Sequence, residues 1–249
     1  MFRSSLSNLT QDQPLQNPAF VANPDDVRAF LGKVFTYMAL ALALSGGVAY
    51  WFGHDMSLIG RLINFETGGM SILGWVVMLA PLGLVLLMGT MMNRLSGSAL
   101  LAVFVAYSVL TGASLSFIFL AYTASSIAAT FFVTAAVFGL MAVLGYTTKT
   151  DLTKLGSILF IGLIGIVIAG LVNMFLKSDT MGYVISIISV IIFTGLTAYD
   201  MQRLKQLGGT VVSGTEMAQK LALMGALSLY LDFLNLFLAL LRLFGSRRD

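Results

Sequence analysis

The segment from Gly225 to Gly245, GALSLYLDFLNLFLALLRLFG, is apolar over a length that can cross a bilayer, yet it carries an aspartate, Asp232, near its middle. A bilayer core about 30 Å thick requires roughly 20 apolar helical residues. A carboxylate at the centre of such a helix is costly and needs a partner, water or a proton. The segment therefore predicts both a membrane helix and a polar site inside the membrane.

The composition of the whole chain indicates an integral membrane protein. Of the 249 residues, 58% are hydrophobic and 10% are charged, whereas about a quarter of a soluble domain is charged. The chain has no cysteine and a single histidine, His54, which excludes thiolate metal sites and multi-histidine zinc or haem sites. No basic cluster is interleaved with aromatic residues, so we expect no nucleic acid partner.

Apolar runs of similar length recur along the chain, and they are continuous instead of alternating, which favours helices over a barrel. Residues 95–148 carry no charge; they are too many for one span, and a polar break at 122–126 divides them into two. We predict an all-α, polytopic transmembrane domain over residues 25–249, after a disordered polar tail over residues 1–24. The seven expected spans lie near residues 34–53, 72–92, 98–121, 127–146, 155–176, 181–200 and 221–243.

The loop charges predict the orientation. If the N-terminus is cytoplasmic, most of the basic residues fall on the inner side, while the outer loops receive Arg61 and Lys177, as the positive-inside rule requires. With seven spans, three arginines at and beyond the end of the last span fall on the outer side and oppose the rule, and an even number of spans would remove that conflict. The inner residues are Arg3, Arg28, Lys33, Arg94, Lys149, Lys154, Arg203, Lys205 and Lys220, and the opposing ones are Arg242, Arg247 and Arg248.

Two acidic residues, Asp200 and Asp232, lie within the apolar runs. Ser228, Asp232 and Asn235 share one helix face at offsets of four and three residues. On the sixth span, Thr197 and Asp200 end a similar polar stripe. If the two carboxyl groups meet, we expect them to share one proton and to titrate as a coupled unit. When both are ionised, they would offer the hard oxygen ligands that calcium prefers, as transient ligands of a passing ion.

Interpretations based on packing stay open. Ser228 and Asn235 could hold Asp232 purely as hydrogen-bonding glue between helices. Asp200 lies at the predicted end of its span, near Arg203, whereas Asp232 lies about 16 Å inside its own. Contact between the acids therefore requires the sixth helix to end below the membrane surface. On the fifth span, small residues line one face and indicate close helix packing. These residues are Gly162, Gly165 and Ala169.

The two acidic segments carry a family resemblance. FTGLTAYDMQRLK (193–205) and ALSLYLDFLNLFLALLRLFG (226–245) resemble the most characteristic segments of the Bax inhibitor-1 family, and FLGKVFTYMALALALSGGVAYWFG (30–53) is similar to its first helix. The resemblance implies a seven-helix bundle with the last helix at its centre, an Asp200/Asp232 pair and a pH-sensitive calcium leak. It also implies an alternative: a non-channel regulator of cell death or, in some bacteria, of a membrane-bound AAA protease.

The resemblance extends to two arginines. Family members carry an arginine at the inner end of the second helix, a place that Arg94 occupies here. Some members pair an arginine near the end of the last helix with an acid in the second helix. Arg242 is therefore a candidate gate at the outer end, but residues 72–92 contain no acid. Asp179, Glu66 and the lipid headgroups stay open as partners of Arg242. In a bacterium, the expected location is the inner membrane.

Other functional classes fit less well. An intramembrane aspartyl protease also needs two helix-borne acids and a Tyr-Asp pair, and Asp200 does follow Tyr199. The second acid, however, stands in LYLD instead of Gly-x-Gly-Asp, and no proline follows Pro81. His54 stands alone for a hydrolase, and no span carries the lysine that a retinal Schiff base requires. We therefore expect no enzymatic activity and no cofactor.

Overall fold

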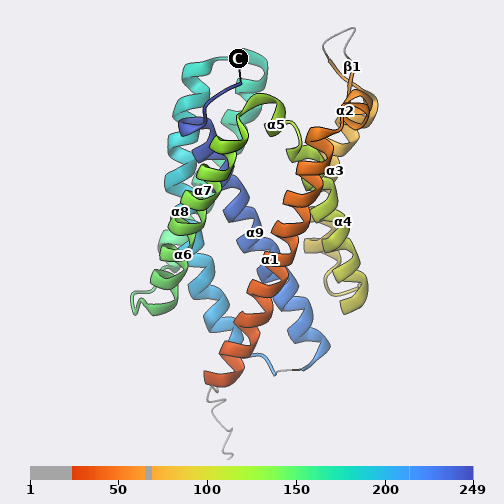
Figure 1. Cartoon of the computed structure of the whole chain (residues 1–249). Helices are drawn as coiled ribbons and strands as arrows, with labels where there is room; N and C mark the ends of the chain where they lie inside the picture. Colours follow the sequence, from red (N-terminus) through yellow and green to blue (C-terminus); the bar gives the residue numbers. More distant parts are fainter. Residues whose placement is uncertain (1–23, 65–68, 213, 249) are drawn as a thin grey trace, which may run out of the picture.

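The structure, a computed structural model, describes residues 24–64, 69–212 and 214–248 (Figure 1). The predicted disordered tail, residues 1–24, lies outside the described residues except for Pro24, which begins the first helix. The helices are α1 (Pro24–His54), α2 (Met56–Leu62), α3 (Ile72–Met91), α4 (Gly97–Leu115), α5 (Ile118–Ala121), α6 (Ala124–Thr147), α7 (Thr153–Leu176), α8 (Asp179–Gly208) and α9 (Glu216–Phe244). A small antiparallel hairpin, β1 (Ile63–Asn64) and β2 (Gly69–Met70), joins α2 to α3.

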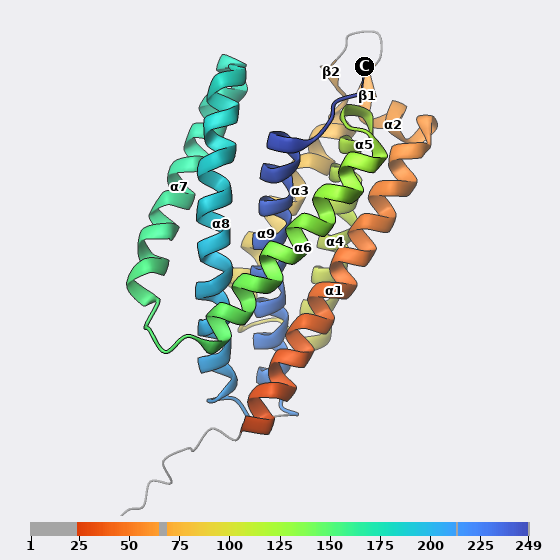
Figure 2. The same cartoon turned by 60° about the vertical axis from the view of Figure 1, so that its left-hand side comes forward.

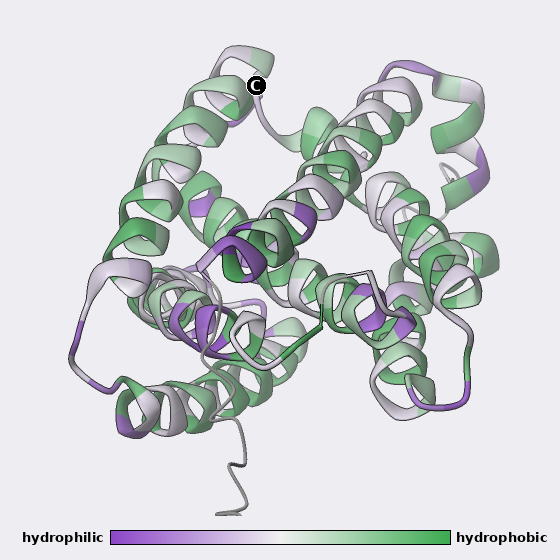
Figure 3. Cartoon of the chain, turned by 90° about the horizontal axis from the view of Figure 1, so that it is seen from below, coloured by the Kyte–Doolittle hydropathy of each residue, from purple (hydrophilic) through white to green (hydrophobic). Residues whose placement is uncertain are grey.

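Seven stretches of the described chain are helical, long and apolar enough to cross a membrane: α1, α3, α4 together with α5, α6, α7, α8 and α9. This confirms the predicted number of spans and the all-α fold class. Because seven is odd, α1 begins at one end of the bundle and α9 ends at the other (Figure 1). Seen along the bundle, hydrophobic residues dominate the helices, and much of the hydrophilic sequence lies in their connections (Figure 3).

Two helices extend beyond the apolar spans predicted for them. The first begins at Pro24, ten residues before its apolar span, and the predicted end of the sixth span at Asp200 is wrong, because α8 continues to Gly208. The added turns of α8 are polar on one side, which ends the hydropathy signal, but they bury Met201 and Leu204. Helical hydrogen bonding therefore outlasts the apolar run, and Asp200 lies eight residues, about 12 Å, before the helix ends.

Short polar residues start most of the long helices. A serine or threonine side chain accepts a backbone N–H from the first turn of five of them, as is usual for N-caps. These caps are Ser71, Ser96, Thr123, Ser178 and Thr215. At the start of α4, the Gly97 N–H also donates to Glu216 Oε1 over 2.9 Å. That bond fixes the start of α4 beside the start of α9.

Helix α9 is the centre of the bundle. About two-thirds (67%) of its most apolar window is buried, against 11% for α7. It packs on α1, α4, α6 and α8, while α3 and α7 lie farther out and pack mainly on α4 and α8 (Figure 2). The expected central position of the last helix is confirmed. One face of α9 is therefore left without a closely packed neighbour, and it carries the partly exposed side chains Ser228, Asn235 and Leu238.

The opposite face of α9 is locked by hydroxyl groups. Tyr230 is fully buried. Ser45 on α1 lies 2.6 Å from the Tyr230 hydroxyl and 2.8 Å from the Ser108 carbonyl oxygen of α4. A serine hydroxyl has one proton, which the carbonyl must receive, so Tyr230 is the donor to Ser45. This chain of two hydrogen bonds joins α1, α4 and α9 inside the bundle.

The end of the chain is tied to the opposite end of the bundle from the start of α1. The Thr123 N–H donates to the Ser246 carbonyl oxygen (3.1 Å), and the Arg248 N–H donates to that of Ala121 (3.0 Å). The residues after α9 thus lie across the connection between α5 and α6. These bonds anchor the end of the central helix.

Candidate functional site: a polar cavity beside the central helix

Two glycines position the segment of α8 that carries Asp200. A Cβ atom at Gly145 of α6 would clash with the Ala198 carbonyl oxygen, and one at Gly156 of α7 would clash with the Tyr199 ring. Both flanking helices therefore approach α8 at the two residues just before Asp200. This close packing directs the Asp200 side chain toward α9.

Asp200 is held by the central helix. Its side chain is 8% exposed, and its Oδ2 accepts a hydrogen bond from the Ser228 hydroxyl of α9. A hydrogen bond to a carboxylate is stronger than one between neutral groups. The bond links α8 to α9 at the point where the sequence places their acidic residues.

Asp232 lies one helical turn after Ser228 on α9 and is 5% exposed. Its Oδ2 is buried and has no hydrogen-bond donor within the described part of the chain. Asp200 and Asp232 both line one cavity of about 570 Å³ between α7, α8 and α9. The structure thus brings together Asp200, Asp232 and Ser228. A buried carboxylate oxygen without a donor calls for a proton, a cation or water.

The cavity exists because α7 packs on α8 and not closely on α9. Smaller cavities continue from it along α9. One of about 320 Å³ shares Asp200 and Ser228, and another of about 280 Å³ shares Asn235. The second of these shares Arg242 with a cavity of about 430 Å³ at the far end of the helix. The four cavities follow the less covered face of α9 from its first half to its last turn.

Two of the predicted site residues lie elsewhere. Thr197 is fully buried and donates its hydroxyl proton to the Phe193 carbonyl oxygen, within α8, and it is not part of the cavity lining. Arg94 lies exposed in the turn after α3 and does not line the cavities around Asp200. The arginine that does line both is Arg203, one turn after Asp200. In the sequence, Arg203 stands out only as a neighbour of Asp200 near the predicted end of the sixth span.

The other predicted residues line the cavities. Asn235 contributes to two of them, while its Nδ2 donates to the Leu231 carbonyl oxygen of its own helix. Arg242 lines the outermost cavity with Asp179 and Arg247. Over the described residues, Arg242 makes no ion pair within 4.0 Å. Glu66, the other proposed partner of Arg242, lies outside the described residues.

The acids do not form a dense metal site. Within residues 24–64, 69–212 and 214–248, no group of three or more His, Cys, Asp or Glu side chains converges. Calcium takes about six to eight oxygen ligands, and the two carboxyl groups supply fewer than that. Asp200 and Asp232 therefore do not complete a calcium site by themselves.

Comparison with known proteins gives consistent matches over nearly the whole described chain. Residues 27–249 match the family model described as "Inhibitor of apoptosis-promoting Bax1". The "Inner membrane protein YbhL" of Escherichia coli K12 is 44% identical over 223 residues, 89% of this chain and 93% of that protein. A protein of Borreliella burgdorferi is 45% identical over 88% of this chain and 93% of its own length. Protein RP147 of Rickettsia prowazekii is 44% identical, with coverage of 90% and 92%.

Proposed function

Because this chain belongs to the Bax inhibitor-1 family of multi-pass membrane proteins, we propose that it conducts a pH-sensitive leak of calcium or similar cations. The single observation that supports this most is the buried Oδ2 of Asp232, which has no donor among the described residues although Asp232 lines the same cavity as Asp200. A purely structural acid would be expected to have its oxygens satisfied. An acid that exchanges protons or ions would not.

The gate is a proton shared by the two acids. When one carboxyl group is protonated, it can donate a short hydrogen bond to the other, which holds α8 against α9. When both are ionised, their like charges repel in a low-dielectric site. Ser228 donates to Asp200 alone, so it does not cancel that repulsion. The leak should therefore increase as the pH rises and the shared proton is lost.

The proposed pathway follows the chain of cavities along α9. Asp200, Arg203 and Ser228 line its first part, Asn235 lies at its middle, and Arg242 stands in the last cavity. We place the start of α1 in the cytoplasm, where most of the loop lysines and arginines then lie. Arg242 would then stand at the outer mouth, where its positive charge opposes cation entry.

Calcium entry into proteoliposomes, followed from about pH 5 to about pH 8, tests this function. We expect a leak that increases with pH, and we expect Asp200→Asn and Asp232→Asn each to flatten that dependence. Asp151→Asn is the matched control: it replaces an exposed loop acid that accepts a hydrogen bond from the Thr153 N–H and lies outside the cavities. The control should keep the wild-type profile.

The same experiment distinguishes the cation leak from the alternative function. The matching family model is named for an inhibitor, which favours a second candidate, a regulator that binds a membrane-bound AAA protease or stress machinery. Calcium entry equal to that of empty liposomes at every pH would reject the leak and favour the regulator. A leak that persists unchanged in both aspartate variants would reject the proton-sharing gate.

A further inference from the structure

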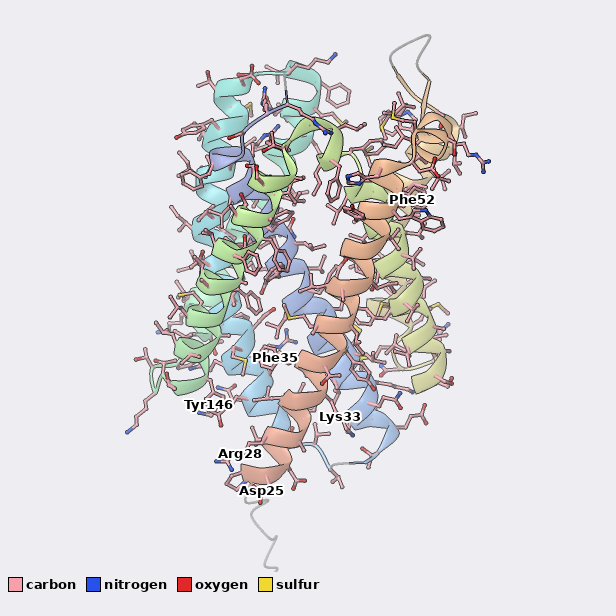
Figure 4. The ribbon with its side chains drawn as sticks, viewed as in Figure 1. Asp25, Arg28, Lys33, Phe35, Phe52 and Tyr146 are labelled. Carbon is pink, nitrogen blue, oxygen red and sulfur yellow. The ribbon has the colours of Figure 1, made fainter. Side chains whose placement is uncertain are left out.

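A second, separate pocket opens at the end of the bundle where α1 begins and α6 ends. It has a volume of about 300 Å³, and its lining includes Arg28, Leu31 and Phe35 of α1 and Val143 and Tyr146 of α6. Figure 4 labels Arg28, Phe35 and Tyr146 on the side of α1 that faces the end of α6. The pocket is almost wholly apolar apart from this arginine.

The pocket lies near the ends of two helices that are long and apolar enough to cross a membrane, where a bilayer interface is expected. It lies within the first turns of α1 and the last turns of α6, and tyrosine is enriched at this depth in membrane proteins. Val143 is 62% exposed on the outer surface of the bundle, so the pocket opens toward lipid. It shares none of its lining residues with the cavities along α9.

Basic side chains frame the pocket. Besides Arg28, Lys205 of α8 donates from Nζ to the Tyr146 carbonyl oxygen over 2.7 Å and lies 4.7 Å from the centre of the Tyr146 ring. Asp25 pairs with Arg28 at 3.7 Å, but both side chains are largely exposed. Exposed ion pairs of this kind contribute little, so a lipid phosphate could compete for Arg28.

An acyl chain alone would not select this pocket. Hydrocarbon tails gain little by moving from the bilayer to an equally apolar protein surface. Selectivity must therefore come from the headgroup, and basic pockets between membrane helices are known to favour anionic headgroups. A zwitterionic lipid offers Arg28 the same phosphate together with a compensating positive charge.

We propose that this pocket binds an acidic phospholipid, with its phosphate at Arg28 and one acyl chain along Leu31, Phe35, Val143 and Tyr146. The bound lipid joins α1 to α6, two helices that do not pack closely on each other. The inference does not depend on the proposed cation leak.

Tryptophan quenching by brominated lipids tests this proposal on the full chain in vesicles. The two native tryptophans, Trp51 and Trp75, are first replaced by phenylalanine. Phe35→Trp then reports on the pocket. Leu40 of α1 is 63% exposed and lies outside the pocket, so Leu40→Trp reports on ordinary surrounding lipid.

At Phe35→Trp, we expect brominated phosphatidylglycerol to be preferred over brominated phosphatidylcholine by roughly fivefold, the effect of one basic residue near a membrane surface. Arg28→Gln should abolish this preference, and Arg28→Lys should retain it. Lys33→Gln is the matched control, because five residues at 100° each place Lys33 on another side of α1, as Figure 4 also indicates. Lys33→Gln should leave the preference unchanged.

Three results would overturn the proposal. Equal quenching by both lipids at Phe35→Trp would make the pocket an ordinary lipid contact. An equal preference at Leu40→Trp would assign the effect to the general charge of the protein. Absence of quenching by either lipid at Phe35→Trp would mean that another protein surface, such as a second copy of this chain, covers the pocket.

Discussion

The Ser228 hydroxyl on α9 donates a hydrogen bond to the Asp200 carboxylate on α8, so one proton donor ties the central helix to the helix beside it within the membrane. The bond joins residues 28 positions apart in the sequence. It gives Asp200 a partner that Asp232 lacks among the described residues. The two acids are therefore unequal, although the sequence presents them as a pair.

Replacement of Ser228 should expose this inequality. Ser228→Ala leaves the buried Asp200 carboxylate without its donor, and we expect it to lower the free energy of unfolding by about 1.5–3 kcal/mol. The loss should be larger at pH 8 than at pH 5, because the ionised carboxylate depends most on a donor. Thermal unfolding in detergent at the two pH values measures it.

Ser157→Ala is the matched control for that experiment. Ser157 lines the same cavity, but its hydroxyl donates to the Thr153 carbonyl oxygen of its own helix. The control should change stability by less than Ser228→Ala at both pH values. Equal effects of the two alanine variants would show that the Ser228 bond contributes nothing beyond an exposed serine.

A second prediction concerns the packing of α7 on α8. Gly156→Ala places a methyl group against the Tyr199 ring, and overpacking of this kind costs about 1–3 kcal/mol. It should also displace Asp200, which follows Tyr199, and so alter the pH dependence of the leak. Gly165→Ala, on the same helix, meets no atom within 4 Å. It should leave stability unchanged or slightly improved, and a loss as large as that of Gly156→Ala would contradict this account.

The outer mouth provides a third prediction. Arg242 lines the last cavity without an ion pair in the described part of the chain, so Arg242→Gln removes a positive charge from the proposed path. We expect cation entry into proteoliposomes to increase a few fold, and more at low ionic strength than at high, because salt screens exposed charges. Arg61→Gln, which removes an exposed charge from α2 at the same end of the bundle, is the control. An equal increase in both variants would assign the effect to general surface charge.

A fourth prediction concerns the loop that follows α1. Asp55 caps α2, and its hydrogen bonds from the Ser57 hydroxyl and backbone N–H hold the pKa of its carboxyl group below the ordinary value of 3.8. A lowered folded-state pKa means that this stabilisation is fully present above the unfolded pKa. It is lost as the pH falls through the folded pKa.

Amide hydrogen exchange can follow this loss. Protection at Ser57 and Leu58 should be constant from neutral pH down to about pH 4 and should then fall. Asp55→Asn should show weaker protection without that pH dependence. If the variant and the wild type lose protection in parallel, the carboxylate is not the cap that controls α2.

The fold was largely predictable from the sequence. The predicted helix limits that differ from the structure differ for one common reason. Continuous apolar runs predicted seven spans, but hydropathy reports the extent of the lipid-compatible surface and not where helical hydrogen bonds end. Helix α8 continues past Asp200 because Met201 and Leu204 are buried by neighbouring helices. The expectation that Asp200 lies at the end of its helix is therefore wrong, because α8 continues to Gly208.

The site was predictable in part. Helical periodicity placed Ser228, Asp232 and Asn235 on one face, and all three line the cavity. Helical periodicity does not tell which neighbouring helix packs against that face of α9. Arg203, which lines the cavity from α8, could therefore not be predicted as a cavity residue. Glycine spacing predicted close packing of α7, but Gly156 makes the closest contact whereas Gly165 faces open space. Contacts between helices depend on their rotation, which local patterns do not encode.

The central position of α9 has a consequence for biosynthesis. The helix that contacts α1, α4, α6 and α8 is the last of the seven along the chain, so the translocon inserts the other six first. Until α9 enters, the buried partners of Tyr230 and Ser228 have no donor, and the inner faces of the earlier helices must face lipid or one another. The bundle can therefore be completed only when its last span has inserted. Insertion factors that shield polar helix faces in the bilayer should act until α9 is in place.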